Sequence, residues 1–304
     1  MPNTPLHRFK TIAEFHEFRG LPKPQHPLIS VVNVEDLKTV QGSGTHNIVN
    51  NFYTIALKRS FNARMRYGQQ EYDFDAGIMF FIAPNQVYSI QAGDGHRHSG
   101  WTMLIHPDFL WNTHLGKAMK QYEFFSYAVN EALHLSEKEE NTIEALIRNI
   151  ALEYQSNIDN FSQDLIVAQL EVLLTYANRF YHRQFLTRKI SNHKILERLE
   201  RLLSDYFDDE HLTSNGLPTV QYISDKLHVS PNYLSGLLKI LTGQSTQQHI
   251  HDKLIEKAKE KLSGTDLSVS EIAYGLGFEH PQSFSKLFKV KTTFSPLEFR
   301  QSFN

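Results

Sequence analysis

Residues 268–288, SVSEIAYGLGFEHPQSFSKLF, decide the fold of the carboxyl-terminal part of this chain. Their apolar residues form two helical stripes that are separated by a break at Gly277. The small side chain of Ala273 suits a point where two helices cross. Gly277 can adopt the positive φ that a sharp turn between helices requires. The spacing therefore predicts a helix-turn-helix unit whose second helix begins near Pro281.

The second predicted helix carries amide, hydroxyl and cationic groups on the face away from its apolar stripe. Groups of this kind suit base edges and phosphates. The residues are Gln282, Ser283, Lys286 and Lys289. We expect Lys286 to project into a DNA groove and Lys289 to meet phosphate. An ordinary surface helix in a helical domain is the alternative interpretation.

The same pattern occurs earlier in the chain, so the unit is repeated. Before the turn, Ile223, Leu227 and Val229 match Ile272, Leu276 and Phe278 at an offset of 49. After the turn, Leu234, Leu237, Leu238, Lys239, Thr242 and Ser245 match Phe284, Leu287, Phe288, Lys289, Thr292 and Ser295 at an offset of 50. Residues 246–262 between the units predict one helix, about 25 Å long at 1.5 Å per residue. That length suits two recognition helices set about 34 Å apart, one DNA turn.

Residues 257–289, KAKEKLSGTDLSVSEIAYGLGFEHPQSFSKLFK, and SPLEFR at 295–300 resemble the AraC/XylS family of transcription regulators. The resemblance covers about the last 115 residues. It implies that two helix-turn-helix units joined by a long helix bind double-stranded DNA, with RNA polymerase as a possible partner. The base-facing residues that it implies are Asn232, Ser235 and Gly236 in the first unit and Gln282, Ser283 and Lys286 in the second. Lys239, His280 and Lys289 complete the predicted set of DNA-binding residues.

Four positions depart from the family pattern. Gly236 stands where many members have arginine, and Thr293 replaces a usual glycine. Ser224 and His228 replace the small alanine and glycine of the first turn. We therefore expect the first unit to read sequence weakly and the second to supply more of the specificity.

Residues 28–107 show short strand-like runs separated by Gly, Asn, Asp and Pro, the pattern of a small β-barrel or sandwich. The stretch DFDAGIMFFIAPNQVYSI, residues 73–90, is similar to the centre of the cupin-like barrel of AraC-type regulators. The predicted fold class is thus α+β: a cupin-like β-barrel with a helical hairpin, followed by an all-α DNA-binding domain.

A small barrel can hold one ligand, so a small-molecule effector is a predicted partner. One alternate set of strand residues is predicted to line its pocket: Tyr53, Ile55, Leu57, Met65 and Tyr67. In the reverse register the cations Lys58, Arg64 and Arg66 face inward, which predicts an anionic ligand. The sequence leaves the register open.

His96 and His98 could point to one side of a strand and bind a metal. Thr102 and Met103 occupy the positions where metal-binding cupins supply a glutamate, and the histidines lie in a Gly-rich loop. Solvated histidines are the favoured interpretation. We expect no metal and no cofactor.

The remaining segments complete the predicted organisation. Residues 1–27 form a Pro-rich arm with a short helix, 108–183 a helical segment, 184–192 a polar linker and 193–304 the DNA-binding domain. Within the helical segment, a helix over 161–180 is apolar over a wide arc. Leu170 or Leu173 is predicted to contact a second copy in a homodimer, with packing on the barrel as the alternative.

Composition restricts the possible functions. The chain has 304 residues, no cysteine and a net charge of −2, although residues 226–304 hold ten Lys or Arg against seven Asp or Glu. No apolar run approaches the 18 residues of a membrane span, which predicts a cytoplasmic protein without a membrane partner.

These features favour a transcription regulator that an effector controls. The absence of paired carboxylates, of a nucleophile with a base and of a complete metal set argues against an enzyme. A cupin-type enzyme fused to a DNA-binding controller and an architectural DNA binder without a ligand are the alternatives.

Overall fold

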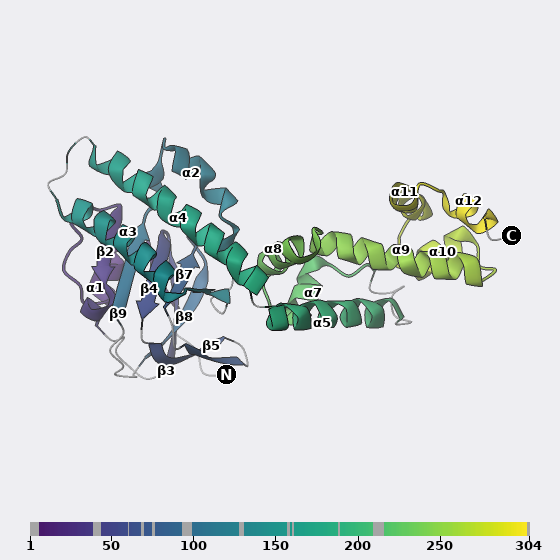
Figure 1. The fold of residues 1–304 in the computed structure, drawn as a ribbon, viewed down its shortest axis with the longest axis horizontal. Helices are drawn as coiled ribbons and strands as arrows, with labels where there is room; N and C mark the ends of the chain where they lie inside the picture. The colour runs from purple at the N-terminus through teal and green to yellow at the C-terminus, as the bar shows by residue number, and fades with distance from the viewer. Residues whose placement is uncertain are drawn as a thin grey trace. The chain divides into compact units, whose positions relative to one another are not determined.

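The computed structural model describes residues 6–302 apart from 39–43, 60, 68–69, 75–76, 93–98, 128–130, 157–158, 160, 188 and 209–215. Side chains at 44, 61–67, 70–74, 91–92, 187 and 189–193 also lie outside the description. The chain divides into two compact units, Met1–Gln184 and Phe185–Asn304. Figure 1 shows the helices and strands of both units.

A five-stranded antiparallel sheet forms the centre of the first unit. Its strand order is β10 (Leu133–His134), β7 (Ile78–Ile82), β4 (Tyr53–Arg59), β9 (Ser99–Ile105) and β2 (Ile29–Asn33). The middle of β4 is buried on both faces, from Thr54 to Leu57. Such a strand needs a packed layer on each side of the sheet.

A three-stranded sheet supplies one of these layers. In it, β3 (Gly44–Asn50) pairs in parallel with β1 (Leu6–Phe9) and antiparallel with β8 (Val87–Ala92). After β1 in the chain, Thr11 and Glu14 form a capping box that begins helix α1 (Ile12–Phe18). Phe9, Ile12 and Phe15 pack in one core cluster with Phe52 and Leu104. From residue 6 onward the predicted arm is therefore docked.

The predicted cupin-like barrel requires a correction. The described strands form sheets of three, five and two strands, the last being the pair β5 (Phe61–Tyr67) and β6 (Gln70–Phe74). Among the described residues no ladder joins these sheets into a closed barrel. The first unit is thus β-rich without closure, since a barrel needs pairing across every edge strand.

Helices cover the other face of the five-stranded sheet. The long helices are α3 (Glu137–Gln155) and α4 (Ser162–Thr187). Besides α1, the short helices of this unit are η1 (Val34–Asp36), η2 (Pro107–Leu110), α2 (His114–Ala118), η3 (Met119–Gln121) and η4 (Glu123–Ser126). Ring centroids of Phe81 on β7 and Tyr181 on α4 lie 6.2 Å apart. Arg59 at the end of β4 pairs with Glu140 and Glu144 on α3.

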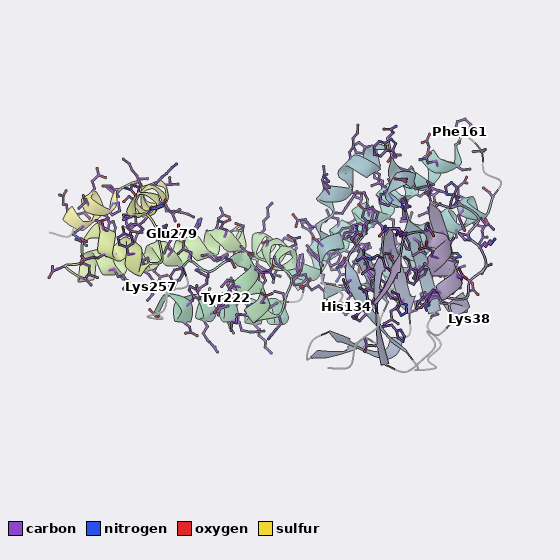
Figure 2. All side chains as sticks on the ribbon, turned by 180° about the vertical axis from the view of Figure 1, so that it is seen from behind. Lys38, His134, Phe161, Tyr222, Lys257 and Glu279 are labelled. Atoms are coloured by element: carbon purple, nitrogen blue, oxygen red, sulfur yellow. The ribbon has the colours of Figure 1, made fainter. Side chains whose placement is uncertain are left out.

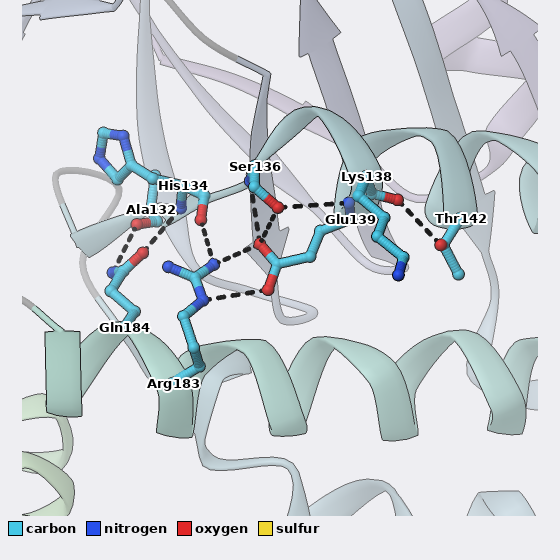
Figure 3. A network of polar contacts seen from close by, with 8 residues as sticks. All are labelled: Ala132, His134, Ser136, Lys138, Glu139, Thr142, Arg183 and Gln184. Carbon is cyan, nitrogen blue, oxygen red and sulfur yellow. Dashed lines mark hydrogen bonds and ion pairs between the residues drawn. The ribbon is translucent and has the colours of Figure 1, made fainter.

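A polar network fixes the last turns of α4 to the start of α3 and to β10, as Figure 3 shows. Arg183 donates to both carboxylate oxygens of Glu139 at 3.0 and 2.6 Å, and Nη2 also donates to the carbonyl of His134 at 2.8 Å. The side chain of Gln184 accepts from the amide of His134 at 2.8 Å and donates to the carbonyl of Ala132 at 3.2 Å. Bidentate pairing of this kind adds geometric specificity, so the end of α4 is held in place on the sheet.

The second unit is all-helical. It contains α5 (Lys189–Asp208), α7 (Val220–Leu227), α8 (Pro231–Thr242), α9 (Thr246–Gly264), α10 (Val269–Gly275), α11 (Pro281–Thr292) and α12 (Pro296–Gln301). One continuous apolar cluster takes residues from α5 and α7 through to α11. Among the described helices of the chain, none is long and apolar enough to cross a membrane.

The predicted linker, residues 184–192, is helical where it is described. Helix α4 continues to Thr187, and α5 already begins at Lys189. The linker prediction was based on the polar composition of this stretch. Polar residues do not end a helix, and the sequence YHRQFLTRKIS contains neither Gly nor Pro.

Candidate nucleic-acid interface

The second helix-turn-helix unit has the predicted geometry. Ser268 and Glu271 form a capping box that begins α10, and Ala273 is fully buried where α10 meets α11. Gly277 has a φ of +82°. The amide of Phe278 donates to the carbonyl of Ala273 at 3.0 Å, which closes the turn.

Helix α11 presents an exposed polar face. Phe284 and Phe288 are fully buried, with ring centroids 5.7 Å apart, and they fix the rotation of the helix about its axis. The four predicted DNA-binding residues of the helix are all exposed: Gln282, Ser283, Lys286 and Lys289. The face can therefore offer amide, hydroxyl and ammonium groups to a DNA groove.

The two recognition helices begin differently. Ser230 Oγ accepts from the amide of Tyr233 at 3.2 Å and so caps α8. His280, the predicted DNA-binding residue before α11, is exposed, and its side chain makes no cap hydrogen bond. The positive end of the α11 dipole is thus open to a phosphate, as helix N-termini commonly are.

Helix α8 presents fewer groups. Asn232 and Lys239 are exposed, whereas Ser235 and Gly236 are half-buried. The hydroxyl of Ser235 lies 3.1 Å from Oγ1 of Thr246 at the start of α9. Since Gly236 has no side chain, the middle of this helix offers no polar side-chain group at the position that Lys286 occupies in α11.

The first turn has two unfavourable features that the second turn lacks. His228 ends α7 in the left-handed conformation with a φ of +59°, where the second unit has Gly277. Ser224 is fully buried where the second unit has Ala273. Among the described residues the Ser224 hydroxyl has no hydrogen-bond partner. Both differences are unfavourable to stability.

Asp252 on α9 links the two helix-turn-helix units, a contact that was not predicted from the sequence. Its carboxylate accepts from Gln244 Nε2 at the end of the first unit and from Lys291 Nζ on α11, each at 2.8 Å. One carboxylate thus ties the turn before α9 to the second recognition helix. A lone polar residue on a mixed helix gives no distinctive sequence signal, so this contact required the structure.

Some lysines of the helical unit form ion pairs, and the three predicted DNA-binding lysines do not in the part of the chain that the structure describes. Lys253, Lys257 and Lys291 form ion pairs with Glu256, with Asp208 and Glu260, and with Asp252, respectively. Hydrogen bonding from Lys257 also lowers the pKa of Asp208. Lys239, Lys286 and Lys289 are exposed, and none of them belongs to an ion pair among the described residues. These three lysines stand on the two recognition helices, where phosphates can neutralise them.

The predicted pocket residues on β4, in the amino-terminal unit, take the second of the two registers that the sequence left open. Tyr53 packs against Phe125, with ring centroids 5.0 Å apart, and Ile55 and Leu57 are buried on the same helix-covered side. They therefore do not face the three-stranded sheet. The side chains of Met65 and Tyr67, and all of His96 and His98, lie outside the described residues.

The two residues predicted at a dimer contact are buried within a single chain. Leu170 and Leu173 are 1% and 0% exposed, which agrees with the alternative that they pack in the core of the amino-terminal unit. The wide apolar arc of α4 includes both a buried and an exposed side, and the sequence did not distinguish them.

Comparison with known proteins shows that the carboxyl-terminal part of this chain is similar to parts of transcription regulators. Residues 223–302 match a family described as a helix-turn-helix domain. The transcriptional activator RhaS of Enterobacter sp. strain 638 is 32% identical over 141 residues, 46% of this chain and 46% of RhaS. YijO of Escherichia coli K12, an uncharacterised helix-turn-helix transcriptional regulator, is 29% identical over 122 residues, 40% of this chain and 42% of YijO. The match therefore spans less than half of either relative.

Among solved structures, the carboxyl-terminal domain of the two-component response regulator YesN from Fusobacterium nucleatum is 31% identical. The match covers 34% of this chain and 95% of that domain, with a TM-score of 0.30.

Proposed function

We propose that this chain is a regulator of the AraC/XylS type and reads specific DNA sequences through two unequal helix-turn-helix units, as the similarity of residues 223–302 to a helix-turn-helix family and to RhaS supports. The observation that carries the proposal is the exposed row Gln282, Ser283 and Lys286 on α11, with Phe284 and Phe288 anchored beneath it. In this proposal α11 contributes most of the base contacts, and α8 contributes Asn232 and the phosphate contact of Lys239.

The length of α9 supports simultaneous binding by both units. Its 19 residues extend about 28 Å at 1.5 Å per residue, close to the roughly 34 Å between successive major grooves on one face of a duplex. We propose that the Asp252 bridge keeps this spacing by holding Lys291 and Gln244 against one helix.

Footprinting on genomic DNA tests the function directly. It should recover a small set of sites, and a duplex of such a site should bind about a thousandfold or more tighter than a scrambled duplex. Equal affinity for both duplexes would leave only non-specific DNA binding, as an architectural protein would show.

We further propose that a small molecule bound to the amino-terminal unit, Met1–Gln184, controls DNA binding. Support comes from the continuity of α4, whose last turns are tied to the sheet by Arg183 and which continues to Thr187. A ligand that binds only the folded unit raises its stability, so a thermal-shift screen separates this proposal from the architectural alternative. Metal analysis of the purified protein tests the enzyme alternative. RNA polymerase stays a predicted partner.

A homodimer through the outer face of α4 is the remaining part of the proposal. Phe161, Leu165 and Val172 are 69%, 49% and 45% exposed, and Ala168 between them is exposed as well. Figure 2 labels Phe161 at the start of this helix. The intervals of four, three and four residues are those of a coiled-coil seam. An antiparallel second copy would set Phe161 opposite Val172 and Leu165 opposite Ala168.

Sedimentation velocity distinguishes this face from other apolar residues. Leu165→Glu should give a folded monomer, because a carboxylate in the seam would be desolvated without a partner. Leu152→Glu is the matched control, since Leu152 is 66% exposed on α3, outside the seam. If Leu165→Glu and Leu152→Glu both sediment as the wild-type dimer, the proposed face is wrong.

A further inference from the structure

The connection between α9 and α10 places no side chain of its own in the core. Residues 263–268 are all exposed, and a Cβ added at Gly264 would meet no atom within 4 Å. An exposed connection of this kind does not by itself fix the direction in which two helices meet. The angle between α9 and α10 is therefore held by groups outside the connection.

Arg300 on α12 supplies such a group. Its Nε donates to the carbonyl of Leu262 in the last turn of α9 at 3.2 Å, and its Nη2 donates to the carbonyl of Leu267 at 2.6 Å. Leu267 directly precedes Ser268, the N-cap residue of α10. Two donors on one planar guanidinium have a fixed relative geometry. Arg300 thus bridges the end of α9 and the start of α10.

The position of Arg300 is tied to the second recognition helix. The ring centroid of Phe299, the preceding residue, lies 5.4 Å from that of Phe288 on α11. Lys259 Nζ on α9 lies 5.8 Å from the same Phe299 ring. Since Phe288 is fully buried and fixes the rotation of α11, the bridge made by Arg300 also relates α11 to α9.

Another contact between α9 and α11 lies nearer the start of α9. The carboxylate of Asp252 accepts from Lys291 Nζ at 2.8 Å. Asp252 and Leu262 are ten residues apart on the helix, about 15 Å at 1.5 Å per residue. Two contacts this far apart restrain the angle of a rod, whereas one contact alone lets the rod pivot. Loss of the Arg300 bridge should therefore loosen the angle between α9 and α11.

Arg300 has no equivalent at the matching position of the first helix-turn-helix unit. The repeat at an offset of 50 aligns it with Ile250, which is buried and carries no polar side-chain group. The backbone design that the two units share thus does not itself require an arginine here. The arginine is specific to the unit that follows the long helix.

We propose that Arg300 is a positioning residue for DNA recognition, which holds α11 at the angle to α9 that matches the spacing of two half-sites. The inference rests on the proposed function, because it concerns how the same two units select that spacing. One added base pair turns one half-site relative to the other by about 34° and moves it by about 3.4 Å. A recognition helix held at one angle cannot follow this change, whereas a helix that pivots can follow part of it.

Titration of the full chain against three duplexes tests the proposal: a footprinted site, and the same site with one base pair added or removed between the half-sites. We expect the wild type to bind the altered sites at least about tenfold more weakly. Arg300→Met should bind the unaltered site about tenfold more weakly than the wild type. Its affinities for the three duplexes should lie within about threefold of one another.

Two further variants separate the bridge from charge and from general stability. Arg300→Lys keeps the charge without the planar fork, so it should lose the spacing preference as Arg300→Met does, and it serves as the second variant if circular dichroism shows that Arg300→Met is misfolded. Gln301→Met, at the exposed neighbouring position, should behave as the wild type.

The proposal is overturned if the wild type binds all three duplexes equally, or if a folded Arg300 variant keeps the wild-type spacing preference. Loss of the preference in Gln301→Met overturns it as well, because the effect would then not belong to the bridge. A scrambled duplex is titrated in parallel. A wild type that binds it as tightly as the footprinted site contradicts the proposed function itself, whereas an unchanged spacing preference in the Arg300 variants contradicts only this inference.

Discussion

The two helix-turn-helix units share one backbone design. Helix α8 ends at Gly243 with a φ of +77°, and α11 ends at Thr293 with a φ of +69°. Each end is followed by a capping box, Ser245 with Gln248 and Ser295 with Glu298. The sequence repeat at an offset of 50 is therefore also a structural repeat.

The units differ in what they do with this design. The first has a buried hydroxyl at Ser224, a left-handed His228 and no side chain at Gly236. The second places alanine, glycine and Lys286 at the matching positions. We interpret the first unit as a support that holds the DNA backbone and the second as the reader of sequence. Stability and recognition can thus be tested unit by unit.

The largest expected effect concerns the shared core. Phe284→Ala should destabilise the second unit by about 3–5 kcal/mol, because it empties a fully buried aromatic site. Since the apolar cluster is continuous from α7 to α11, amide hydrogen exchange should accelerate in α7 and α8 as well. The matched change Leu234→Ala in the first unit should accelerate exchange in α10 and α11. Exchange confined to the mutated unit would contradict a single core.

A reciprocal exchange at the crossing point should give the next effect. Ser224→Ala should stabilise the first unit, and Ala273→Ser should destabilise the second, each by about 1–3 kcal/mol, because a buried hydroxyl without a partner loses its hydration. Urea denaturation of the full chain, followed by circular dichroism, measures both. If Ser224→Ala is destabilising, the hydroxyl makes a contact that this comparison omits.

The helix ends offer a smaller test. Thr293→Gly should stabilise the second unit by about 1–2 kcal/mol, since a β-branched residue is strained at positive φ. Gly243→Thr is the mirror change and should destabilise the first helix-turn-helix unit by a similar amount through its positive φ alone, because an added Cβ meets no atom within 4 Å there. Thermal unfolding should show a raised Tm for Thr293→Gly and a lowered Tm for Gly243→Thr. Changes of the same sign in the two variants would refute the strain argument.

The smallest expected effect concerns DNA affinity and the two lysines that the repeat aligns, Lys239 and Lys289. Lys289→Ala and Lys239→Ala should each weaken cognate and scrambled duplexes alike and reduce the salt slope by about one contact. Lys253→Ala is the control, because that lysine is paired with Glu256. Titration at two salt concentrations measures the slopes. A sequence-dependent loss for Lys289→Ala would make it a base contact instead.

Helix positions in the second helix-turn-helix unit could be predicted because each of its helices has a single buried stripe. The spacing in 268–288 gave α10, the turn at Gly277 and the start of α11 at Pro281, as the structure has them. The capping boxes of α3 and α10 have the Ser-x-x-Glu pattern that marks a helix start.

Features of the amino-terminal unit, Met1–Gln184, could not be predicted in the same way. The register of β4 stayed open because each alternate set of residues in YTIALKR ends in a cation, Lys58 in one and Arg59 in the other, so neither set marks the inner face. Strands β1 and β3, with sequences LHRF and GTHNIVN, were missed because polar residues interrupt their apolar pattern. In α4, apolar residues lie on two sides, so the sequence could not separate core Leu173 from exposed Leu165.

The position that distinguishes the units most simply is Gly236, the counterpart of Lys286. Gly236→Arg should add a base contact and change the preferred sequence of the half-site that the first unit reads. Lys286→Ala should lose about 1–3 kcal/mol on the specific site and relax its preference, while binding to scrambled DNA stays nearly constant.

Selection of bound sequences from random DNA, carried out with the wild type and Lys286→Ala in parallel, is the most direct test of unequal units. We expect the wild type to return one strongly specified and one weakly specified half-site, and Lys286→Ala to relax only the strong one. Two equally specified half-sites in the wild type, or an unchanged strong half-site in Lys286→Ala, would contradict the assignment of sequence reading to the second unit.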